Sequence, residues 1–302
     1  CDVEISDFVA YLADDKSTDV IMVYFEGNRD ADKLTASFRK ARENGKPVVL
    51  LKAGRSETGI KAAVSHTGSM AGSDAAFDGF CRQFDVHRAD TVGELIDIAV
   101  ACAAGKYPAR PRVGLVSISG GAGALMADYC AEVGLSVPPL PKPAQAKLMK
   151  LFPFGSALNP IDPTALWGQD MSVLSASMET LLKEGKHDSV VLFGSTIGIN
   201  PFNRVRFEEH IIPLRKKYPK PLMVLSLLGA PDLIQKWRNE GFLIYEDARR
   251  AIEVTAALAK FGPLVRGRRQ YPARPRVPDN LRIKPKASFN EADAMKALEK
   301  AG

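Results

Sequence analysis

Five short runs of apolar residues constrain the fold of this chain more than any other feature. They lie at Val20–Phe25, Val48–Leu51, Val113–Val116, Val190–Phe193 and Leu222–Leu225. Strands that are apolar on both faces are typical of parallel sheets covered by helices, whereas half-exposed strands alternate apolar and polar residues. The runs therefore predict buried parallel strands.

Helical patterns lie between these runs. Apolar residues recur at helical spacing in groups such as Leu34, Phe38 and Ala41, and Leu95, Ile98 and Cys102. Because strand and helix patterns alternate, the sequence predicts an α/β fold with doubly wound parallel sheets.

The domain organisation follows from one polar, proline-bearing stretch, Lys106–Arg112. We expect one domain at residues 1–107 and a second at 108–262, since 302 residues can fill two cores. The first domain opens with a helical pattern and has only two strong strands, so we expect it to be incomplete at its N-terminus. Residues 263–302 are expected to form a basic, proline-rich linker and the first helix of another domain.

The net charge of +6 is concentrated in that linker. Eight basic residues and one acid lie between Pro263 and Ala287, together with five prolines. An extended, solvated linker explains this composition better than a nucleic-acid site, so no specific nucleic-acid binding is expected. No apolar stretch approaches the ~18 residues that cross a bilayer, so no membrane association is expected either.

The cysteines indicate a reducing, cytoplasmic environment. Cys1, Cys81, Cys102 and Cys130 are far apart and lack CxxC spacing. This pattern favours free thiols over a disulfide framework or a zinc site, and we predict no metal centre.

A single histidine among small and hydroxyl-bearing residues is the first candidate for chemistry. His66 lies in the segment Ser65–Asp74, which comes after the second apolar run. Ligand crevices in open α/β sheets form at the C-terminal ends of strands. His66 is therefore either a surface histidine or a nucleophile, and Glu26, at the end of the preceding strand, is a candidate to fix its tautomer. A simple strand-end acid is the alternative for Glu26.

A glycine-rich turn is the second candidate. Gly120, Gly121, Ala122 and Gly123 come after the third apolar run and open a helix, where unshielded N–H groups form an anion site. Met126 replaces the third glycine of the dinucleotide fingerprint, so phosphate fits better than a dinucleotide. A turn that serves only close helix–strand packing is the alternative.

Four segments together carry a family resemblance. Lys52–Arg55, Ser65–Asp74, Ser119–Gly123 and Asn159–Asp162 resemble the NDP-forming acyl-CoA synthetases, which include succinyl-CoA synthetase and ADP-forming acetyl-CoA synthetase. The resemblance implies that this chain matches their two middle, flavodoxin-like ligase-CoA domains. A CoA-binding domain before them and an ATP-grasp domain after them would then be missing partners.

The resemblance also implies an activity and its residues. It implies a reversible acid–thiol ligase that forms acyl-CoA from a small carboxylic acid, CoA and ATP, and releases ADP and phosphate. His66 would carry a transient phosphoryl group and Glu26 would steady it. The phosphate-binding residues would be Ser65, Thr67, Gly68, Gly120, Gly121, Ala122 and Gly123. Asn159 and Asp162 are candidate substrate-binding residues.

CoA and ATP or ADP, with magnesium, are expected to bind mainly to the missing domains, so this piece is expected to be inactive alone. A homo-oligomer is possible. The alternative function is a non-catalytic module that senses acyl-CoA or phosphate in a protein acyltransferase, or an interaction scaffold.

Overall fold

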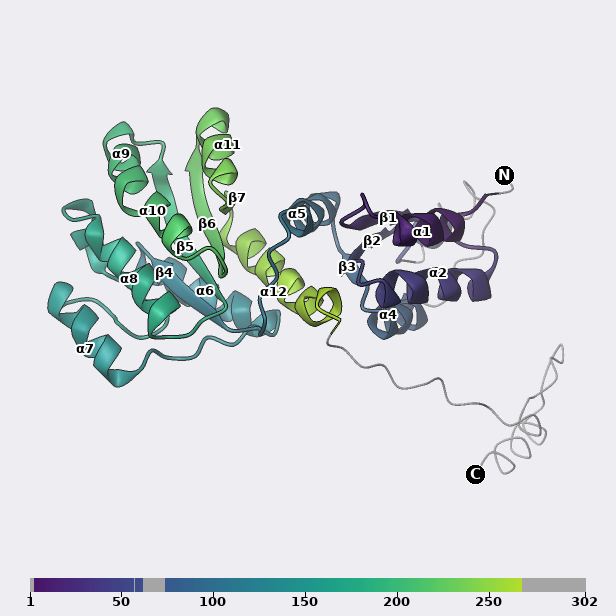
Figure 1. Cartoon of the computed structure of the whole chain (residues 1–302), viewed down its shortest axis with the longest axis horizontal. Helices are drawn as coiled ribbons and strands as arrows, with labels where there is room; N and C mark the ends of the chain where they lie inside the picture. The colour runs from purple at the N-terminus through teal and green to yellow at the C-terminus, as the bar shows by residue number, and fades with distance from the viewer. Residues whose placement is uncertain (1–2, 57, 62–73, 268–302) are drawn as a thin grey trace, which may run out of the picture. The chain divides into compact units, whose positions relative to one another are not determined.

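The computed structural model describes residues 3–56, 58–61 and 74–267 of the chain (Figure 1). All of these residues belong to one compact unit, Cys1–Arg268. Two parallel sheets lie within it, as the apolar runs predicted.

The first sheet has the strand order β1-β2-β3. Its strands are β1 (Ile21–Phe25), β2 (Val48–Lys52) and β3 (His87–Ala89), all parallel, with Ile21 opposite Val48 and Val49 opposite His87. The helices around it are α1 (Ile5–Asp14), α2 (Ala31–Glu43), α4 (Asp74–Gln83) and α5 (Val92–Ala103). Side chains of α1, α2 and α4 form one core with Ile21, Val23 and Phe25, while α5 packs on the opposite face. The sheet is therefore wound on both faces.

Local capping explains where two of these helices begin. The Asp30 side chain accepts a hydrogen bond from the Lys33 amide at 2.9 Å, at the start of α2. The Thr91 hydroxyl accepts one from the Glu94 amide at 3.1 Å, at the start of α5. Each cap satisfies a backbone N–H that has no partner inside its helix.

The second sheet has the strand order β4-β5-β6-β7. Its parallel strands are β4 (Val113–Ser117), β5 (Ser189–Gly198), β6 (Leu222–Gly229) and β7 (Leu243–Tyr245). Helices α6 (Gly120–Glu132) and α12 (Ala248–Val265) pack on one face. The other face is covered by α7 (Lys142–Leu151), α8 (Ser172–Lys183), α9 (Pro201–His210), α10 (Ile212–Lys217) and α11 (Pro231–Asn239), and a 3-10 turn lies at Thr164–Gly168.

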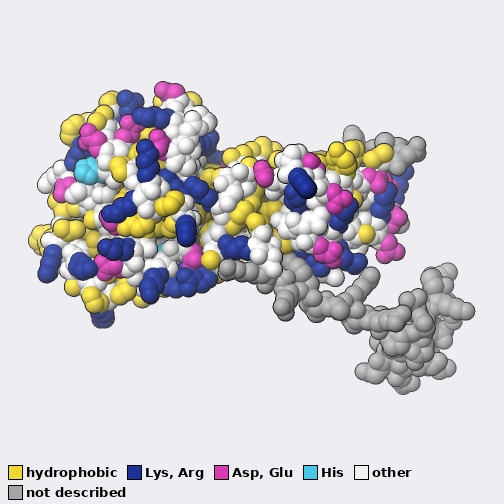
Figure 2. Space-filling model, in the orientation of Figure 1, with side chains coloured by type: hydrophobic (Ala, Val, Ile, Leu, Met, Phe, Trp, Pro, Cys, Tyr) yellow, Lys and Arg dark blue, Asp and Glu magenta, His cyan; other side chains and the backbone are white. Residues whose placement is uncertain are grey.

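The surface of the described residues carries both signs of charge. On the face seen in Figure 2, Lys and Arg side chains are interspersed with Asp and Glu. This agrees with the concentration of the net positive charge in the sequence after Pro263.

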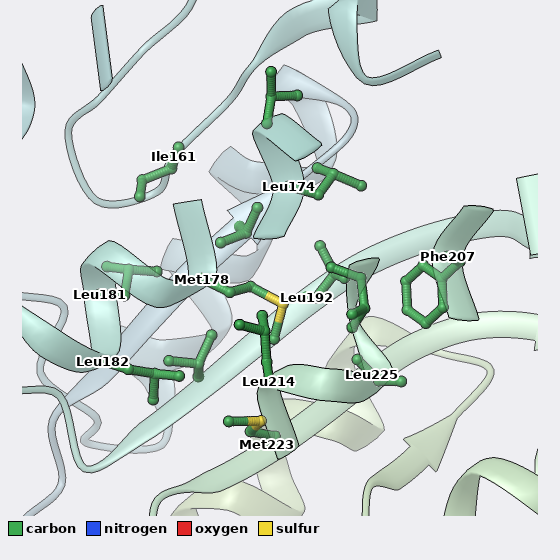
Figure 3. Close-up of a cluster of buried hydrophobic side chains, with 14 of the residues drawn as sticks. Ile161, Leu174, Met178, Leu181, Leu182, Leu192, Phe207, Leu214, Met223 and Leu225 are labelled. Carbon is green, nitrogen blue, oxygen red and sulfur yellow. The ribbon is translucent and has the colours of Figure 1, made fainter. Parts of the chain in front are cut away.

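Two apolar cores explain why the strands of the second sheet are apolar on both faces. Leu192 and Leu225 point into the core under α7–α11, together with Met178 and Phe207 (Figure 3). Val191 and Val224 point to the opposite face, where α6 and α12 cover them. Successive strand residues point to opposite sides, so a sheet covered on both faces needs an unbroken apolar run.

One of these cores joins the two sheets. Ile98 of α5 and Phe261 of α12 are fully buried in the same apolar cluster, which also contains Val49 and Val113. The predicted boundary near residue 107 therefore separates two sheets that share a core.

The start of the predicted linker needs a correction. Helix α12 continues through Pro263 to Val265, because buried Phe261 and Leu264 hold its last turn against the shared core. Residues 263–265 are therefore helical and do not belong to a linker. None of the helices in the described ranges combines the length and apolar character that a bilayer crossing requires.

Candidate functional site

Two of the predicted site elements lie where parallel strands end. Glu26 directly follows β1, and Gly120 lies three residues after the end of β4. The segment with Ser65, His66, Thr67 and Gly68 lies outside the described residues, so its position relative to Glu26 stays a prediction. Its flanks are described: residues 58–61 are helical, and Asp74 begins α4.

Asp74, the last residue of the segment Ser65–Asp74 and the one residue of it that the structure describes, is held by two cations. Arg88 Nη2 lies 2.6 and 2.7 Å from the two carboxylate oxygens, and Lys52 Nζ lies 3.2 Å from Oδ1. The side chains of Lys52 and Arg88 are only 5% and 12% exposed. Burial opposes ionisation of Asp74, but the hydrogen bonds from Arg88 and Lys52 outweigh it and lower the pKa of this carboxyl group.

Aromatic packing completes this cluster. The Phe77 ring centroid is 5.7 Å from Lys52 Nζ and 5.8 Å from Arg88 Cζ, and the ring stacks on Phe25 at 4.7 Å. These contacts tie the first turn of α4 to the ends of β1 and β2 and to β3. The C-terminal flank of the His66 segment is therefore anchored at the edge of the sheet where the crevice was predicted.

Sequence reasoning did not find the roles of Arg88 and Phe77. One signal was available: Lys52 ends an otherwise apolar strand whose every residue is buried. A buried lysine requires a carboxylate or another acceptor nearby. Its partner Asp74 lies 22 positions away, however, so no local pattern identifies it.

Glu26 lies at the end of β1, where the sequence predicted it. Its side chain is partly exposed, and it has no hydrogen-bond or ion-pair partner among the described residues. The carboxylate is therefore available to a further group. The role of Glu26 beside His66 stays a prediction.

The glycine-rich turn opens α6 with two unpaired amides. Ser119 Oγ accepts a long hydrogen bond, 3.5 Å, from the Ala122 amide, and Ser119 O accepts one from the Gly123 amide at 2.9 Å. The amides of Gly120 and Gly121 have no acceptor among the described residues. They are donors that an anion can use.

The need for glycine differs along this turn. A Cβ on Gly123 would contact Pro160 and Ser117 at 3.5 Å, and one on Gly120 would lie 2.9 Å from Asp162 Oδ2. A Cβ on Gly121 would meet nothing within 4 Å. Close packing thus accounts only for Gly120, because the contacts at Gly123 are ordinary van der Waals contacts. At Gly121 the missing side chain leaves open space beside the two amides.

The two residues predicted to bind substrate differ in their surroundings. Asn159 Oδ1 accepts a hydrogen bond from the Leu115 amide at 2.8 Å, and Nδ2 donates to Val113 O and Pro138 O at 2.9 Å each. Its side chain thus pairs with backbone groups of β4 on the edge that β5 does not occupy. Both amide atoms are used in the fold, so the predicted contact between Asn159 and substrate gains no support.

Asp162 lies beside the glycine-rich turn. Its Oδ1 accepts a hydrogen bond from the Thr164 amide at 2.8 Å, and its Oδ2 faces Gly120. The fold therefore brings Asp162 and Gly120–Gly123 together, although they are about forty residues apart in the sequence. In the described ranges, no group of three or more His, Cys, Asp or Glu side chains is arranged to hold a metal ion.

Comparisons with known proteins agree with this architecture. Residues 1–102 match the family described as "Succinyl-CoA ligase like flavodoxin domain". Among curated proteins, the chain is 31% identical over 262 residues to the alpha subunit of the ADP-forming acetate–CoA ligase I of Pyrococcus furiosus, covering 86% of this chain and 56% of that one. It is also 31% identical over 301 residues to the ADP-forming acetate–CoA ligase I of Archaeoglobus fulgidus, covering 98% and 41%.

A solved structure is similar as well. The dinucleotide-forming acetyl-coenzyme A synthetase 1 of Ca. Korarchaeum cryptofilum, in complex with phosphate and ADP, matches with a TM-score of 0.73 and 25% identity, over 88% of this chain and 58% of that one. The fold thus consists of flavodoxin-like, doubly wound α/β domains. The chain belongs with the ADP-forming acyl-CoA synthetases, as its motifs predicted, and it spans about half or less of the length of these curated relatives.

Proposed function

We propose that this chain supplies the phosphoryl-transfer part of an acid–thiol ligase. The overall reaction would form acyl-CoA from a small carboxylic acid, CoA and ATP, and would release ADP and phosphate reversibly. The observation that carries the proposal is the start of α6, where the amides of Gly120 and Gly121 have no acceptor among the described residues and a Cβ on Gly121 would meet nothing within 4 Å. The names of the curated relatives support the same reaction class.

The chemistry explains why such an enzyme needs a phosphoryl carrier. A carboxylate and a thiol do not condense unaided in water, so the acid is first joined to phosphate as a mixed anhydride. His66 would attack the phosphorus of the acyl phosphate or of ATP. A nitrogen–phosphorus bond then forms while the phosphorus–oxygen bond to the carboxylate or to ADP breaks. The reverse step passes the phosphoryl group on.

The residues of this chain would make that transfer possible in three ways. Glu26 would accept a hydrogen bond from one ring nitrogen and leave the other free to attack. The first turn of α6 would stabilise the phosphoryl charge, with about 0.3–1 kcal/mol from the helix end when exposed and up to about 2 kcal/mol when partly buried. Oriented N–H donors in a desolvated site would supply the larger share.

The remaining substrates would bind elsewhere. Among the described residues, the amides of Gly120 and Gly121 at the start of α6 fit phosphate as a ligand. CoA and ATP or ADP, with magnesium, would bind mainly to CoA-binding and ATP-grasp domains that are not part of this chain. Those domains are its proposed partners, and this chain by itself would not complete the reaction.

A labelling experiment tests the proposal on the chain itself. The 302-residue chain is incubated with acetyl phosphate labelled with phosphorus-32, which supplies the phosphoryl group without the ATP-binding domain. We expect an acid-labile, base-stable label that is absent from His66→Gln and retained in His210→Gln. A label that persists in His66→Gln would remove His66 as the carrier. Phosphate binding without any labelling would favour the sensing module over the enzyme.

A further inference from the structure

A second concave site lies away from the proposed phosphoryl site. It is a cavity of about 610 Å³ between α5 on one side and α11 and β7 on the other. Leu222 and Leu243, which begin β6 and β7, line it. It therefore lies at the amino ends of these strands, whereas the Gly120 turn comes after the carboxyl end of β4. Its volume is typical of pockets that bind small molecules.

One wall of this cavity is an apolar stripe of α5. Ile96 and Val100 are four residues apart, so they lie on one helix face, and they are 47% and 55% exposed. In Figure 2 hydrophobic side chains gather on the surface at the position of α5. Leu243 and Phe242 line the opposite wall. The cavity can thus hold the apolar body of a ligand.

The polar end of the cavity carries uncompensated positive charge. Lys106 Nζ donates to Gly241 O at 3.4 Å, and no carboxylate lies within 4.0 Å of it among the described residues. Burial lowers the pKa of Lys106, and the nearby charge of Arg215 lowers it further. Arg238, which also lines the cavity, donates to Ile244 O at 3.0 Å and forms no ion pair within that same part of the chain.

The neighbouring charges do not neutralise this end. Arg215 is 4% exposed, and its guanidinium donates to the carbonyl oxygens of Pro219 and Pro221 instead of a carboxylate. Asp97 is the one acidic side chain among the described residues that line the cavity, and Arg250 already binds both of its oxygens at 2.7 and 2.8 Å. Lys106 is partly buried and has no carboxylate partner among the described residues, so this end of the cavity favours binding of an anion.

We propose that this cavity binds an aliphatic carboxylate, with the carboxylate at Lys106 and the chain along Ile96 and Val100. The apolar walls select against inorganic phosphate and acetate, which have no apolar body to bury. The Lys106 ammonium, which has no carboxylate partner among the described residues, selects against neutral molecules of the same length. This site is separate from His66 and does not depend on phosphoryl transfer.

Octanoate is the probe for this site, titrated into the 302-residue chain by isothermal calorimetry. We expect one molecule to bind per chain, at least tenfold more tightly than octan-1-ol or acetate. A hydrogen bond to a charged group is strong enough for a tenfold effect, so Lys106→Gln should weaken octanoate binding at least tenfold. Lys106→Arg should retain most of the affinity. Lys150→Gln, an exposed lysine on α7 outside the cavity lining, is the matched control and should bind as the wild type does.

A variant with a charge on the apolar wall distinguishes a loss of binding at this site from a general loss of stability. Ile96→Glu should abolish octanoate binding while the thermal midpoint stays within a few degrees, because this side chain is half exposed. Equal binding of octan-1-ol and octanoate would overturn the proposal. So would unchanged octanoate binding in Lys106→Gln, or the absence of binding to the wild type.

Discussion

Arg88 Nη2 bonds both carboxylate oxygens of Asp74, at 2.6 and 2.7 Å, and so joins strand β3 to the first turn of helix α4. Lys52, at the end of β2, approaches the same carboxylate from another strand. The consecutive elements α4 and β3 and the more distant strand β2 thus meet at one acid. This acid is the last residue of the segment Ser65–Asp74, which contains His66.

Removing Arg88 should therefore destabilise the fold more than removing an exposed cation. Arg88→Met leaves Asp74 with Lys52 alone and opens a partly buried cluster. We expect a loss of about 1–3 kcal/mol in the free energy of unfolding, measured by urea denaturation. This range is lower than for a fully buried pair, because the Asp74 side chain is one-third exposed and solvent screens its charge. Arg82→Met is the matched control, because Arg82 forms an exposed ion pair with Asp78, and both residues lie on α4. This substitution should lower the free energy of unfolding by less than about 1 kcal/mol. Equal losses in the two variants would contradict a special role for the cluster.

The ionisation of Asp74 should make this contribution depend on pH. The native pKa of Asp74 lies below its unfolded value, so its charge stabilises the fold above the unfolded pKa of about 3.9. That stability is lost as the pH falls through the native pKa. The stability difference between wild type and Asp74→Asn should stay constant from pH 7 to about 4 and shrink below it. A difference that grows on acidification would refute the assignment.

Gly121 should tolerate a side chain structurally and yet lose phosphate. A Cβ there would meet nothing within 4 Å, so we expect the thermal midpoint of Gly121→Val to change little. Its side chain would fill the place of the phosphate, so labelling of His66 should fall at least tenfold. Gly93→Val is the matched control, because the two glycines occupy the same position in their helices. Gly93 is the second residue of α5, after the N-cap Thr91, and Gly121 is the second residue of α6, after the N-cap Ser119. The control should label as the wild type does. Full labelling in Gly121→Val would leave the glycine without a phosphate-binding role.

Glu26→Gln should slow labelling of His66 without destabilising the chain. Glu26 has no hydrogen-bond or ion-pair partner among the described residues, so the free energy of unfolding of the Glu26→Gln variant should stay within about 0.5 kcal/mol of the wild-type value. The lost charge would weaken the hydrogen bond that orients the imidazole. Glu246→Gln is the matched control, because Glu246 directly follows β7 as Glu26 directly follows β1. In this variant His66 should be labelled at the wild-type rate. A wild-type rate in Glu26→Gln would exclude the proposed positioning role.

Asn159 should prove structural. Asn159→Ala removes three hydrogen bonds to backbone groups around β4, which should lower the free energy of unfolding by about 2–4 kcal/mol. Asn203→Ala, on α9, is a control that should cost little, because this side chain is partly exposed and makes no hydrogen bond among the described residues. If Asn159→Ala kept wild-type stability but lost activity in the assembled enzyme, a substrate contact would be the better explanation of this residue.

The sequence by itself determined the sheet type and the helices around it. Burial on both faces is visible in a run such as Val48–Leu51, and a cap such as Thr91 acts within three residues, so both features can be read locally. The glycine-rich turn at the start of α6 was predictable for the same reason. The motifs also identified the family, because they are short and contiguous.

Only the tertiary structure decided which side chains meet. The pairing of Arg88 with Asp74, the use of Asn159 at the edge of β4, and the approach of Asp162 to Gly120 all join residues between 14 and 46 positions apart. The same holds for α12, which continues past a proline because a core shared by both sheets stabilises its last turn. Such contacts depend on how strands and helices pack, and a local pattern carries no record of a distant partner.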